Sequence, residues 1–242
     1  MTNHVTAHPI EWTPERVKRF WDFYSSNPAL DDTYFARLVG RSLLAFVGKR
    51  IRIGSAADIG CGRGDLIEFL LDGGHSAYGA DSSASSLEKV RKRFEGRSGF
   101  KGTTMMDGGK VSLPSETIDT AFMIEVVEHM DDGALQAALT EAKRLLRKGG
   151  HVVLTTPNEE NLDASKTMCP ECGSIYHRVQ HVRSWSADTL RAYVEPLGFS
   201  TLTCEATVLA PYTGPLGLLY RTVYPMIRHR RPHLVYIGRK IG

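Results

Sequence analysis

A glycine-rich turn between a short apolar run and a helical segment constrains the fold of this chain most strongly. The run "AADIG" leads into "CGRGD" and then into "DLIEFLLDGG", which has helical spacing. Gly60, Gly62 and Gly64 allow a tight turn and a close approach of backbone to a ligand. Asp81 ends the next apolar run about twenty residues further on, where a carboxylate can accept hydrogen bonds from ribose hydroxyls. The combination predicts a nucleotide-type site, and a purely structural glycine turn is the alternative.

The rest of the chain alternates between strand and helix patterns. "SSLEKVRKRF" and "GALQAALTEAKRLLRKGG" predict helices, the second of them closed by Gly149 and Gly150. Besides "AADIG" and "SAYGAD", the runs of strand type are "FKGTTMM", "TIDTAFMIE", "HVVLTTP", "STLTCEATVL" and "HLVYIGRK". This order predicts an α/β fold with an open, mostly parallel sheet of seven strands.

Three segments fall outside this rhythm. "PERVKRFWDFYSS" and "DDTYFARLVGRSLLAFVG" predict amphipathic helices, which we assign to an N-terminal helical cap over residues 1–50. Residues 51–242 then form one domain with insertions near 158–183 and 210–232, each long enough to act as a lid. The second insertion is rich in Pro, Gly, Tyr and Arg, and predicts either a site for a phosphate or anionic glycan or a solvated loop.

Composition excludes several classes of protein. The 242 residues are 42% hydrophobic and 24% charged, as in an ordinary globular protein, and a net charge of +3 does not by itself call for a nucleic-acid partner. No apolar run approaches the roughly 18 residues of a transmembrane helix. The N-terminus has no signal-peptide pattern, so we expect a cytoplasmic protein. In the cytoplasm a disulfide framework is not expected for the four cysteines, Cys61, Cys169, Cys172 and Cys204.

From about Ile53 onward the motifs resemble those of class I S-adenosylmethionine-dependent methyltransferases. "DIGCGRGD" is similar to the first motif of that family, "YGADSS" to the second, and "MMDGGKVSLPSETIDTAFMIEVVEHM" to the third and fourth. The resemblance implies a Rossmann-like methyltransferase sheet with S-adenosylmethionine as cofactor. It implies contacts from Asp58, Gly60, Cys61, Gly62 and Gly64 to the methionine part, from Asp81 to the ribose and from Asp107 to the adenine amino group, with Ser82 and Glu125 also at the cofactor. Trp21, Phe23 and Tyr24 either fold over the cofactor, as leading helices do in many relatives, or only pack their helix.

Two glutamates and a histidine lie where the fourth strand should end. Glu125, Glu128 and His129 either cap a turn and begin a helix, or form part of a catalytic site. The pieces E-x-x-E-H, T-P-N-x-E-x-N and H-x-x-x-W, in this order, resemble those of small-RNA 3′-terminal 2′-O-methyltransferases, although the middle piece here reads T-P-N-E-E-N. The matching residues are Glu125, Glu128, His129, Thr156, Pro157, Asn158, Glu160, His181 and Trp185.

In that family two glutamates and two histidines bind a divalent cation that engages vicinal hydroxyls of the acceptor. The resemblance implies Glu125, Glu128, His129 and His181 as ligands, with Mg²⁺, Mn²⁺ or Fe²⁺ as the ion. Glu128, His129 and His181 are therefore the predicted catalytic residues, and His129 acting alone as a general base is the alternative.

The acceptor is less well defined by these motifs. E-x-x-E-H also occurs in ubiquinone-pathway O-methyltransferases, which act on small phenols, and this chain has no recognisable RNA-binding module. We therefore expect an enzyme, an O-methyltransferase acting on a hydroxyl of a small molecule or sugar-containing metabolite. An RNA ribose 2′-O-methyltransferase is the second hypothesis, and a cofactor-binding scaffold without catalysis is the third.

The cysteine pair of the first insertion indicates a separate metal site. Cys169 and Cys172 resemble half of a zinc ribbon, and a closed tetrahedral site needs two more ligands. His177 and His181 follow at C-x₄-H-x₃-H spacing, so all four side chains are candidates for one local zinc ion. The alternatives are that the cysteines bind zinc with His177 and another ligand, or that they bind no metal.

Overall fold

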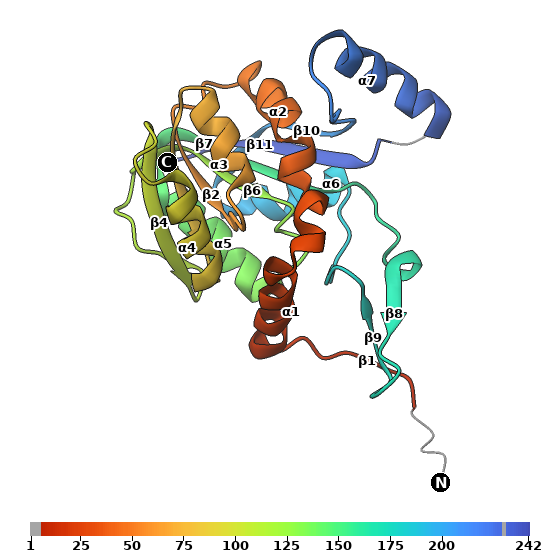
Figure 1. The fold of residues 1–242 in the computed structure, drawn as a ribbon. Coiled ribbons are helices and arrows are strands. Elements are labelled where there is room, and N and C mark those ends of the chain that lie inside the picture. Colours follow the sequence, from red (N-terminus) through yellow and green to blue (C-terminus); the bar gives the residue numbers. More distant parts are fainter. Residues whose placement is uncertain (1–5, 229–230) are drawn as a thin grey trace.

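The computed structural model describes residues 6–228 and 231–242 and shows an eight-stranded sheet with helices on both faces (Figure 1). The strand order is β10-β11-β7-β6-β2-β3-β4-β5. The pairs from β7 to β4 are parallel, whereas β11 is antiparallel to β7 and β10, and β5 is antiparallel to β4. These strands are β2 Ser55–Ile59, β3 Ser76–Asp81, β4 Phe100–Asp107, β5 Lys110–Val111, β6 Ile118–Ile124, β7 Leu146–Pro157, β10 Phe199–Thr207 and β11 His233–Lys240. The Rossmann-like, mostly parallel sheet is confirmed, with the two-residue β5 added to the seven predicted strands.

Side chains of each central strand alternate between two hydrophobic clusters. Ala56 and Phe122 belong to the cluster on one face, and their neighbours Ala57 and Met123 belong to the cluster on the other. This is the period of two that a sheet buried on both faces requires. The first face is covered by α2 Phe35–Gly48, α3 Asp65–Asp72 and α4 Ala84–Phe94, and the second by α5 Asp132–Leu145 and α6 Ala187–Val194. The short 3₁₀ helices are η1 Pro28–Thr33, η2 Leu162–Ser165 and η3 Glu195–Leu197.

Helix α5 ends earlier than its sequence predicts. The expected end at Gly149 and Gly150 is wrong, because the helix stops at Leu145 and strand β7 begins at Leu146. Leu146 is fully buried and pairs with Ile118 of β6. Packing of this leucine in the core therefore overrides the helical pattern of the residues that follow it.

A small separate sheet is built from the N-terminus and the first insertion. We call residues 158–183 the lid. The sheet has the order β1-β9-β8, with β1 His8–Pro9 parallel to β9 Ser174–His177 and β8 Lys166–Met168 antiparallel to it. It lies beside α1 Pro14–Ser26, apart from the main sheet (Figure 1). The division of the chain at residue 50 stays a prediction, and α2 packs into the same core as the sheet.

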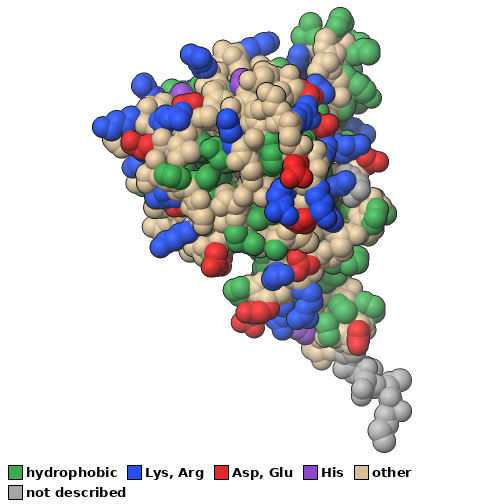
Figure 2. Space-filling view, turned by 60° about the vertical axis from the view of Figure 1, so that its left-hand side comes forward, with side chains coloured by type: hydrophobic (Ala, Val, Ile, Leu, Met, Phe, Trp, Pro, Cys, Tyr) green, Lys and Arg blue, Asp and Glu red, His purple; other side chains and the backbone are tan. Residues whose placement is uncertain are grey.

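The second insertion contains a helix, α7 Gly214–Arg228, where the sequence left open an anion site or a solvated loop. Leu216, Leu219 and Met226 of this helix are exposed, and hydrophobic side chains gather at the upper corner of the molecule in Figure 2. Residues 229 and 230 of the insertion lie outside the described part of the chain. Within that part, no helix combines the length and the apolar character needed to cross a membrane.

Candidate functional site

The glycine loop connects β2 to α3 at the carboxyl edge of the sheet. Gly60, Gly62 and Gly64 have φ values of 80°, 49° and 79°, in the left-handed region that favours glycine. A Cβ atom on Gly60 would lie 2.7 Å from Val126, and one on Gly64 would lie 2.8 Å from Phe94. The turn therefore requires glycine for its backbone angles and, at two of the three positions, for space.

Asp81 ends β3 beside this loop. Its Oδ2 accepts a hydrogen bond from the amide of Gly62 at 2.8 Å, and its Oδ1 accepts one from the amide of Ser83 at 2.8 Å. Burial raises the pKa of Asp81, and the backbone amides of Ser83, Gly62 and Ser82 offset part of this effect. The carboxylate thus fixes the loop and lies where the sequence predicts a contact with ribose.

The other cofactor candidates occupy three different environments. Asp58 in β2 is buried, and burial, followed by the charges of Asp81 and Asp65, raises its pKa to about 8. The side chain of Cys61 is buried in the cluster under α3, so any contact with a cofactor is left to its backbone. Asp107 is exposed at the turn between β4 and β5. Their contacts with S-adenosylmethionine stay predictions.

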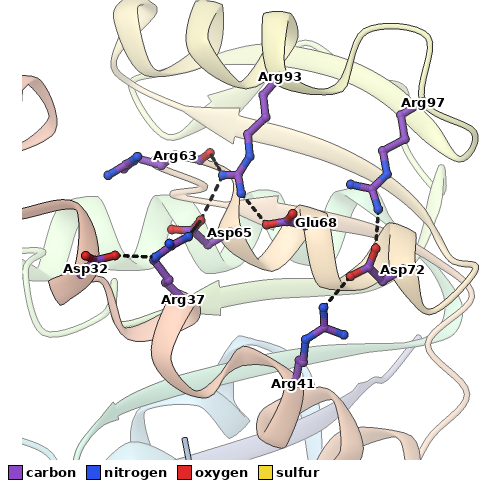
Figure 3. Close-up of polar contacts among 9 residues, drawn as sticks. All are labelled: Asp32, Arg37, Arg41, Arg63, Asp65, Glu68, Asp72, Arg93 and Arg97. Carbon is purple, nitrogen blue, oxygen red and sulfur yellow. Dashed lines mark hydrogen bonds and ion pairs between the residues drawn. The ribbon is translucent and has the colours of Figure 1, made fainter. Parts of the chain in front are cut away.

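A network of ion pairs holds α2, α3 and α4 together next to the glycine loop (Figure 3). Asp65 begins α3 and is 4% exposed, and its carboxylate lies 3.0 Å from Arg93 and 4.0 Å from Arg37. The guanidinium of Arg93 also donates to the carbonyl of Arg63 in the loop at 3.0 Å. The remaining pairs are Arg37–Asp32, Arg93–Glu68, Arg41–Asp72 and Arg97–Asp72. The network ties the loop to three helices.

Glu128 is the most unusual side chain at this edge of the sheet. It is 1% exposed, and neither carboxylate oxygen has a hydrogen-bond partner of ordinary geometry among the described residues. Burial, followed by the charge of Glu125, raises the pKa of Glu128 well above its usual value, and its own backbone amide and the nearby Thr156 hydroxyl offset only part of this. The lid approaches here because the amide of Val182 donates to the carbonyl of Glu128 at 2.9 Å. A buried carboxylate with so little hydrogen bonding is costly unless a cation or a proton accompanies it.

Two imidazoles face this carboxylate. Nε2 of His129 and Nε2 of His181 each lie 3.9 Å from Oε1 of Glu128. Nδ1 of His129 lies 3.3 Å from the carbonyl of Gln180, and Nδ1 of His181 contacts the carboxylate of Glu160. A carbonyl or carboxylate accepts only from a protonated Nδ1, so in the neutral form of each ring the lone pair lies on Nε2. Burial, followed by His181, lowers the pKa of His129 to about 3, which keeps that ring neutral.

His177 lies beside this group but carries its proton on the opposite nitrogen. Its Nδ1 accepts hydrogen bonds from the amides of Val179 at 3.4 Å and His181 at 3.2 Å, which places the ring proton on Nε2. That Nε2 lies 3.3 Å from Oε1 of Glu160, at an angle too poor for a full hydrogen bond. Glu160, His177 and His181 also have ligand atoms within 4.8 Å of one another. The proton positions nevertheless favour Glu160 as a carboxylate that orients His181, rather than a second ion site.

The structure brings together three of the four predicted ligands. The ligand atoms of Glu128, His129 and His181 lie within 4.8 Å of one another, and Glu125 is not part of this group. Oε1 of Glu125 instead accepts a hydrogen bond from the Thr155 hydroxyl at 2.8 Å, and burial raises the pKa of Glu125 to about 7. The sequence did not assign a role to Glu160, although it belongs to the T-P-N-E-E-N motif.

The predicted local zinc site is not formed, which corrects the expectation for His177 and His181. Cys169 and Cys172 lie at the turn of the β8–β9 hairpin, whereas His177 lies at the other end of β9 and pairs with Lys166. A strand rises about 3.3 Å per residue, so roughly 10 Å of strand separates the two ends of β9. The two histidines belong instead to the group around Glu128 and Glu160.

The aromatic residues of α1 have different surroundings. Nε1 of Trp21 donates to Oε1 of Gln180 at 2.9 Å, and its ring meets the ring of His129 edge-on at 4.8 Å. Phe23 is 65% exposed, and Tyr24 packs edge-on against Tyr34. Trp21 therefore covers the candidate metal group, whereas Phe23 faces solvent.

Fold and site together define a class of protein. A glycine loop after a central parallel strand, followed by an acid at the end of the next strand, is the arrangement of class I methyltransferases. The model of the methyltransferase domain family matches residues 32–203. The chain belongs to this methyltransferase domain family.

Curated relatives match part of the chain. The ubiquinone biosynthesis O-methyltransferase of Alkalilimnicola ehrlichii is 28% identical over 160 residues, which cover 64% of this chain and 61% of that protein. The protein of the same description from Cereibacter sphaeroides is 34% identical over 119 residues, which cover 48% of this chain and 44% of that protein. The matches thus span less than two thirds of these relatives.

Solved structures share the fold at low identity. A chain of the complex between the Haloferax volcanii Trm112 methyltransferase activator and a methyltransferase has a TM-score of 0.67 and 15% identity, covering 92% of this chain and 98% of that chain. The Burkholderia thailandensis 1,6-didemethyltoxoflavin-N1-methyltransferase has a TM-score of 0.64 and 18% identity, covering 98% and 94%. The cyclase SpnF has a TM-score of 0.65 and 17% identity, covering 98% and 99%. A cyclase among these neighbours means that the fold alone does not fix the reaction.

Proposed function

We propose that this chain is an S-adenosylmethionine-dependent O-methyltransferase that binds its acceptor hydroxyl through a divalent cation held by Glu128, His129 and His181. One observation carries the proposal: two imidazole Nε2 atoms, which hold the lone pair when the rings are neutral, lie 3.9 Å from the same oxygen of a buried carboxylate that accepts no hydrogen bond of ordinary geometry from the described residues. One carboxylate and two imidazoles suit Mg²⁺, Mn²⁺ or Fe²⁺. Ligand atoms held at about 2.1 Å from one ion lie roughly 3 to 3.5 Å apart, so small side-chain movements suffice.

The cofactor part of the proposal rests on the glycine loop and Asp81. The loop lies at the carboxyl edge of the sheet with its three glycines in the left-handed region, and the Asp81 carboxylate is fixed beside it by two amides. A methyl sulfonium is reactive without a metal, so the protein has only to exclude water and align the methyl group with the acceptor oxygen. Glu128 and His129 follow β6, which neighbours the strand that carries the loop.

The acceptor is inferred to carry a hydroxyl beside a second oxygen. A bound divalent cation lowers the pKa of a hydroxyl that it coordinates, and two adjacent oxygens bind it more firmly than one. A small phenol or a sugar offers such a pair. The description of the relatives as ubiquinone biosynthesis O-methyltransferases supports a hydroxyl acceptor.

A mechanism in which His129 acts alone as general base is the main competitor. It needs only the free Nε2 of that ring, which the hydrogen bond of Nδ1 to Gln180 also supplies. A ring whose pKa is lowered to about 3 is a weak base at neutral pH. The general-base mechanism also gives no role to the buried carboxylate of Glu128.

The experiment that tests this proposal follows methyl transfer from labelled S-adenosylmethionine to a panel of catechols and polyols. A chelator should abolish transfer and Mg²⁺ or Mn²⁺ should restore it, while calorimetry shows unchanged cofactor affinity. Glu128→Ala should be nearly as damaging as His129→Ala, whereas His151→Ala, in the middle of β7 and paired with Thr120 of β6, should retain activity. Full activity of the chelated enzyme, with His129→Ala alone inactive, would refute the metal and leave the histidine as base.

A further inference from the structure

A buried glutamine of the lid, Gln180, connects two segments that meet at the group around Glu128. Its side chain is fully buried. Its Oε1 accepts a hydrogen bond from Nε1 of Trp21 in α1 at 2.9 Å, and its Nε2 donates to the carbonyl of His129 at 3.0 Å. An indole nitrogen only donates and a backbone carbonyl only accepts, so these two partners leave one orientation for the amide. The contacts of Gln180 therefore define its geometry completely.

The backbone of Gln180 is as specific as its side chain. Its φ is 61°, a left-handed conformation that is uncommon for a residue other than glycine. Its amide donates to the carbonyl of His177 at 2.8 Å, which closes a tight turn, and its own carbonyl lies 3.3 Å from Nδ1 of His129. The turn thus supplies the acceptor that leaves the lone pair of the neutral His129 ring on Nε2. The next residue is His181, the other imidazole that faces Glu128.

The identity of this residue points to its side chain. Glycine would take up a left-handed φ without steric cost, whereas a side chain there is disfavoured. What glutamine adds at this position is the amide that joins α1 to His129. Helix α1 has no buried residue among its thirteen, and the ring of Trp21 meets the ring of His129 edge-on at 4.8 Å. The bond from Trp21 to Gln180 therefore holds a helix with little packing of its own over that imidazole.

We propose that Gln180 is a positioning residue, which orients His129 toward Glu128 and keeps Trp21 over this imidazole. The inference rests on the proposed function, because the ring that Gln180 orients is a ligand of the proposed cation. Both ends of the amide are bonded to protein groups, so Gln180 acts through His129 and not as a further ligand. Its loss should weaken the site in two ways, by freeing the ring of His129 and by uncovering it.

Calorimetric titration with Mn²⁺ measures the first effect in the full-length protein. Gln180→Met keeps the length of the side chain and removes both of its hydrogen bonds, so Mn²⁺ affinity should fall by at least about tenfold. Trp21→Phe removes only the indole donor and should cost less. The double variant should be no weaker than Gln180→Met, because both changes break the same contact. Gln136→Met, at an exposed position of α5, should bind like the wild type, and circular dichroism checks that each variant is folded.

Modification of His129 by diethyl pyrocarbonate, followed by mass spectrometry without metal, measures the second effect. The reagent acylates a free imidazole nitrogen, and the side chain of His129 is 13% exposed. His129 should react several-fold faster in Gln180→Met than in the wild type, whereas His75, beyond the end of α3, should react equally in both.

The two measurements separate this inference from the proposed function. A wild type that binds no Mn²⁺ would overturn the proposed function, and faster modification of His129 in Gln180→Met would still support the positioning role. A wild-type rate for His129 in Gln180→Met would overturn the inference itself. Additive losses of Mn²⁺ affinity in the double variant would overturn the part that assigns Trp21 to the amide.

Discussion

At the scale of single residues, the candidate site depends on where three imidazole rings carry their protons. His129 and His181 have oxygen acceptors at Nδ1, whereas His177 has two amide donors there. A neutral ring has one lone pair, so these contacts leave Nε2 free in the first two and protonate it in the third. The hydrogen-bond partner of Nδ1, rather than spacing in the sequence, distinguishes the predicted ligands His129 and His181 from His177.

Glu160 should act on metal binding without being a ligand. Glu160→Gln replaces the charged acceptor of His181 with a neutral amide, and Mn²⁺ affinity should fall roughly 10- to 100-fold. Glu159→Gln, at an exposed neighbouring position, should leave affinity unchanged. Calorimetric titration with Mn²⁺ makes the measurement. Equal affinities for the two variants would contradict the role of Glu160 in orienting His181.

Asp81 should control cofactor affinity. Asp81→Ala removes the acceptor of the Gly62 and Ser83 amides and of the proposed ribose contact, so S-adenosylmethionine should bind more than about tenfold more weakly, equivalent to roughly 1.5–3 kcal/mol. Asp188→Ala, on the exposed first turn of α6, is the matched control. Unchanged affinity in Asp81→Ala, measured by calorimetry, would remove the basis for the ribose contact.

His233 should make stability depend on pH. Burial lowers its pKa to about 4, and its Nδ1 accepts the amide of Leu209 at 2.9 Å, so the folded protein holds it neutral. Between about pH 6.5 and pH 4 the histidine is protonated in the unfolded state but not in the folded state. The free energy of unfolding should therefore fall by about 1.4 kcal/mol for each unit by which the pH is lowered in this range. Asp58 and Glu125, whose pKa values are raised, act in the opposite direction.

The effect of His233 is therefore read from a difference. Urea denaturation of the wild type and of His233→Gln across this range should give free energies of unfolding that converge as the pH falls. Only the wild type has a histidine here that takes up a proton on unfolding, so only the wild type loses stability for this reason. A constant difference between the two free energies of unfolding from pH 7 to pH 4 would show that His233 already binds its proton in the folded state.

At the scale of elements, the network beside the glycine loop joins three helices through one buried carboxylate. Arg93→Met should leave Asp65 with a poorly compensated charge and lower the free energy of unfolding by roughly 1–3 kcal/mol. Arg97→Met removes a pair with Asp72, which is one-third exposed, and should cost less than about 1 kcal/mol. Equal losses in urea denaturation would show that burial of Asp65 does not matter.

Elements differ in how well the sequence predicts them. The glycine loop and Asp81 can be predicted from short stretches of sequence, because the loop needs glycine for its backbone angles and Asp81 follows it at a fixed spacing. Both lie where predicted. The end of α5 depends on the burial of Leu146 against β6, which no local pattern shows. The zinc prediction failed at His177 for the same reason: spacing in the chain does not reveal that the hairpin separates its turn from its base.

At the scale of the whole molecule, the sheet brings the proposed cofactor site and the group around Glu128 to one edge. The sequence predicted the α/β fold and most of the candidate group, because parallel strands align their carboxyl ends. It could not predict Glu160 as the partner of His181, or His8 beside the cysteines, because these contacts join segments that only the folded lid brings together.

The most direct test of the central claim is a crystal structure grown with Mn²⁺, with the ion located by its anomalous scattering. We expect a peak within about 2.3 Å of a Glu128 oxygen and of Nε2 of His129 and His181, with Nδ1 of His181 still on Glu160. Glu128→Gln grown under the same conditions should lose the peak. A wild-type crystal saturated with Mn²⁺ that shows no peak between these three side chains, or an ion bound to His177 in place of His181, would contradict the account.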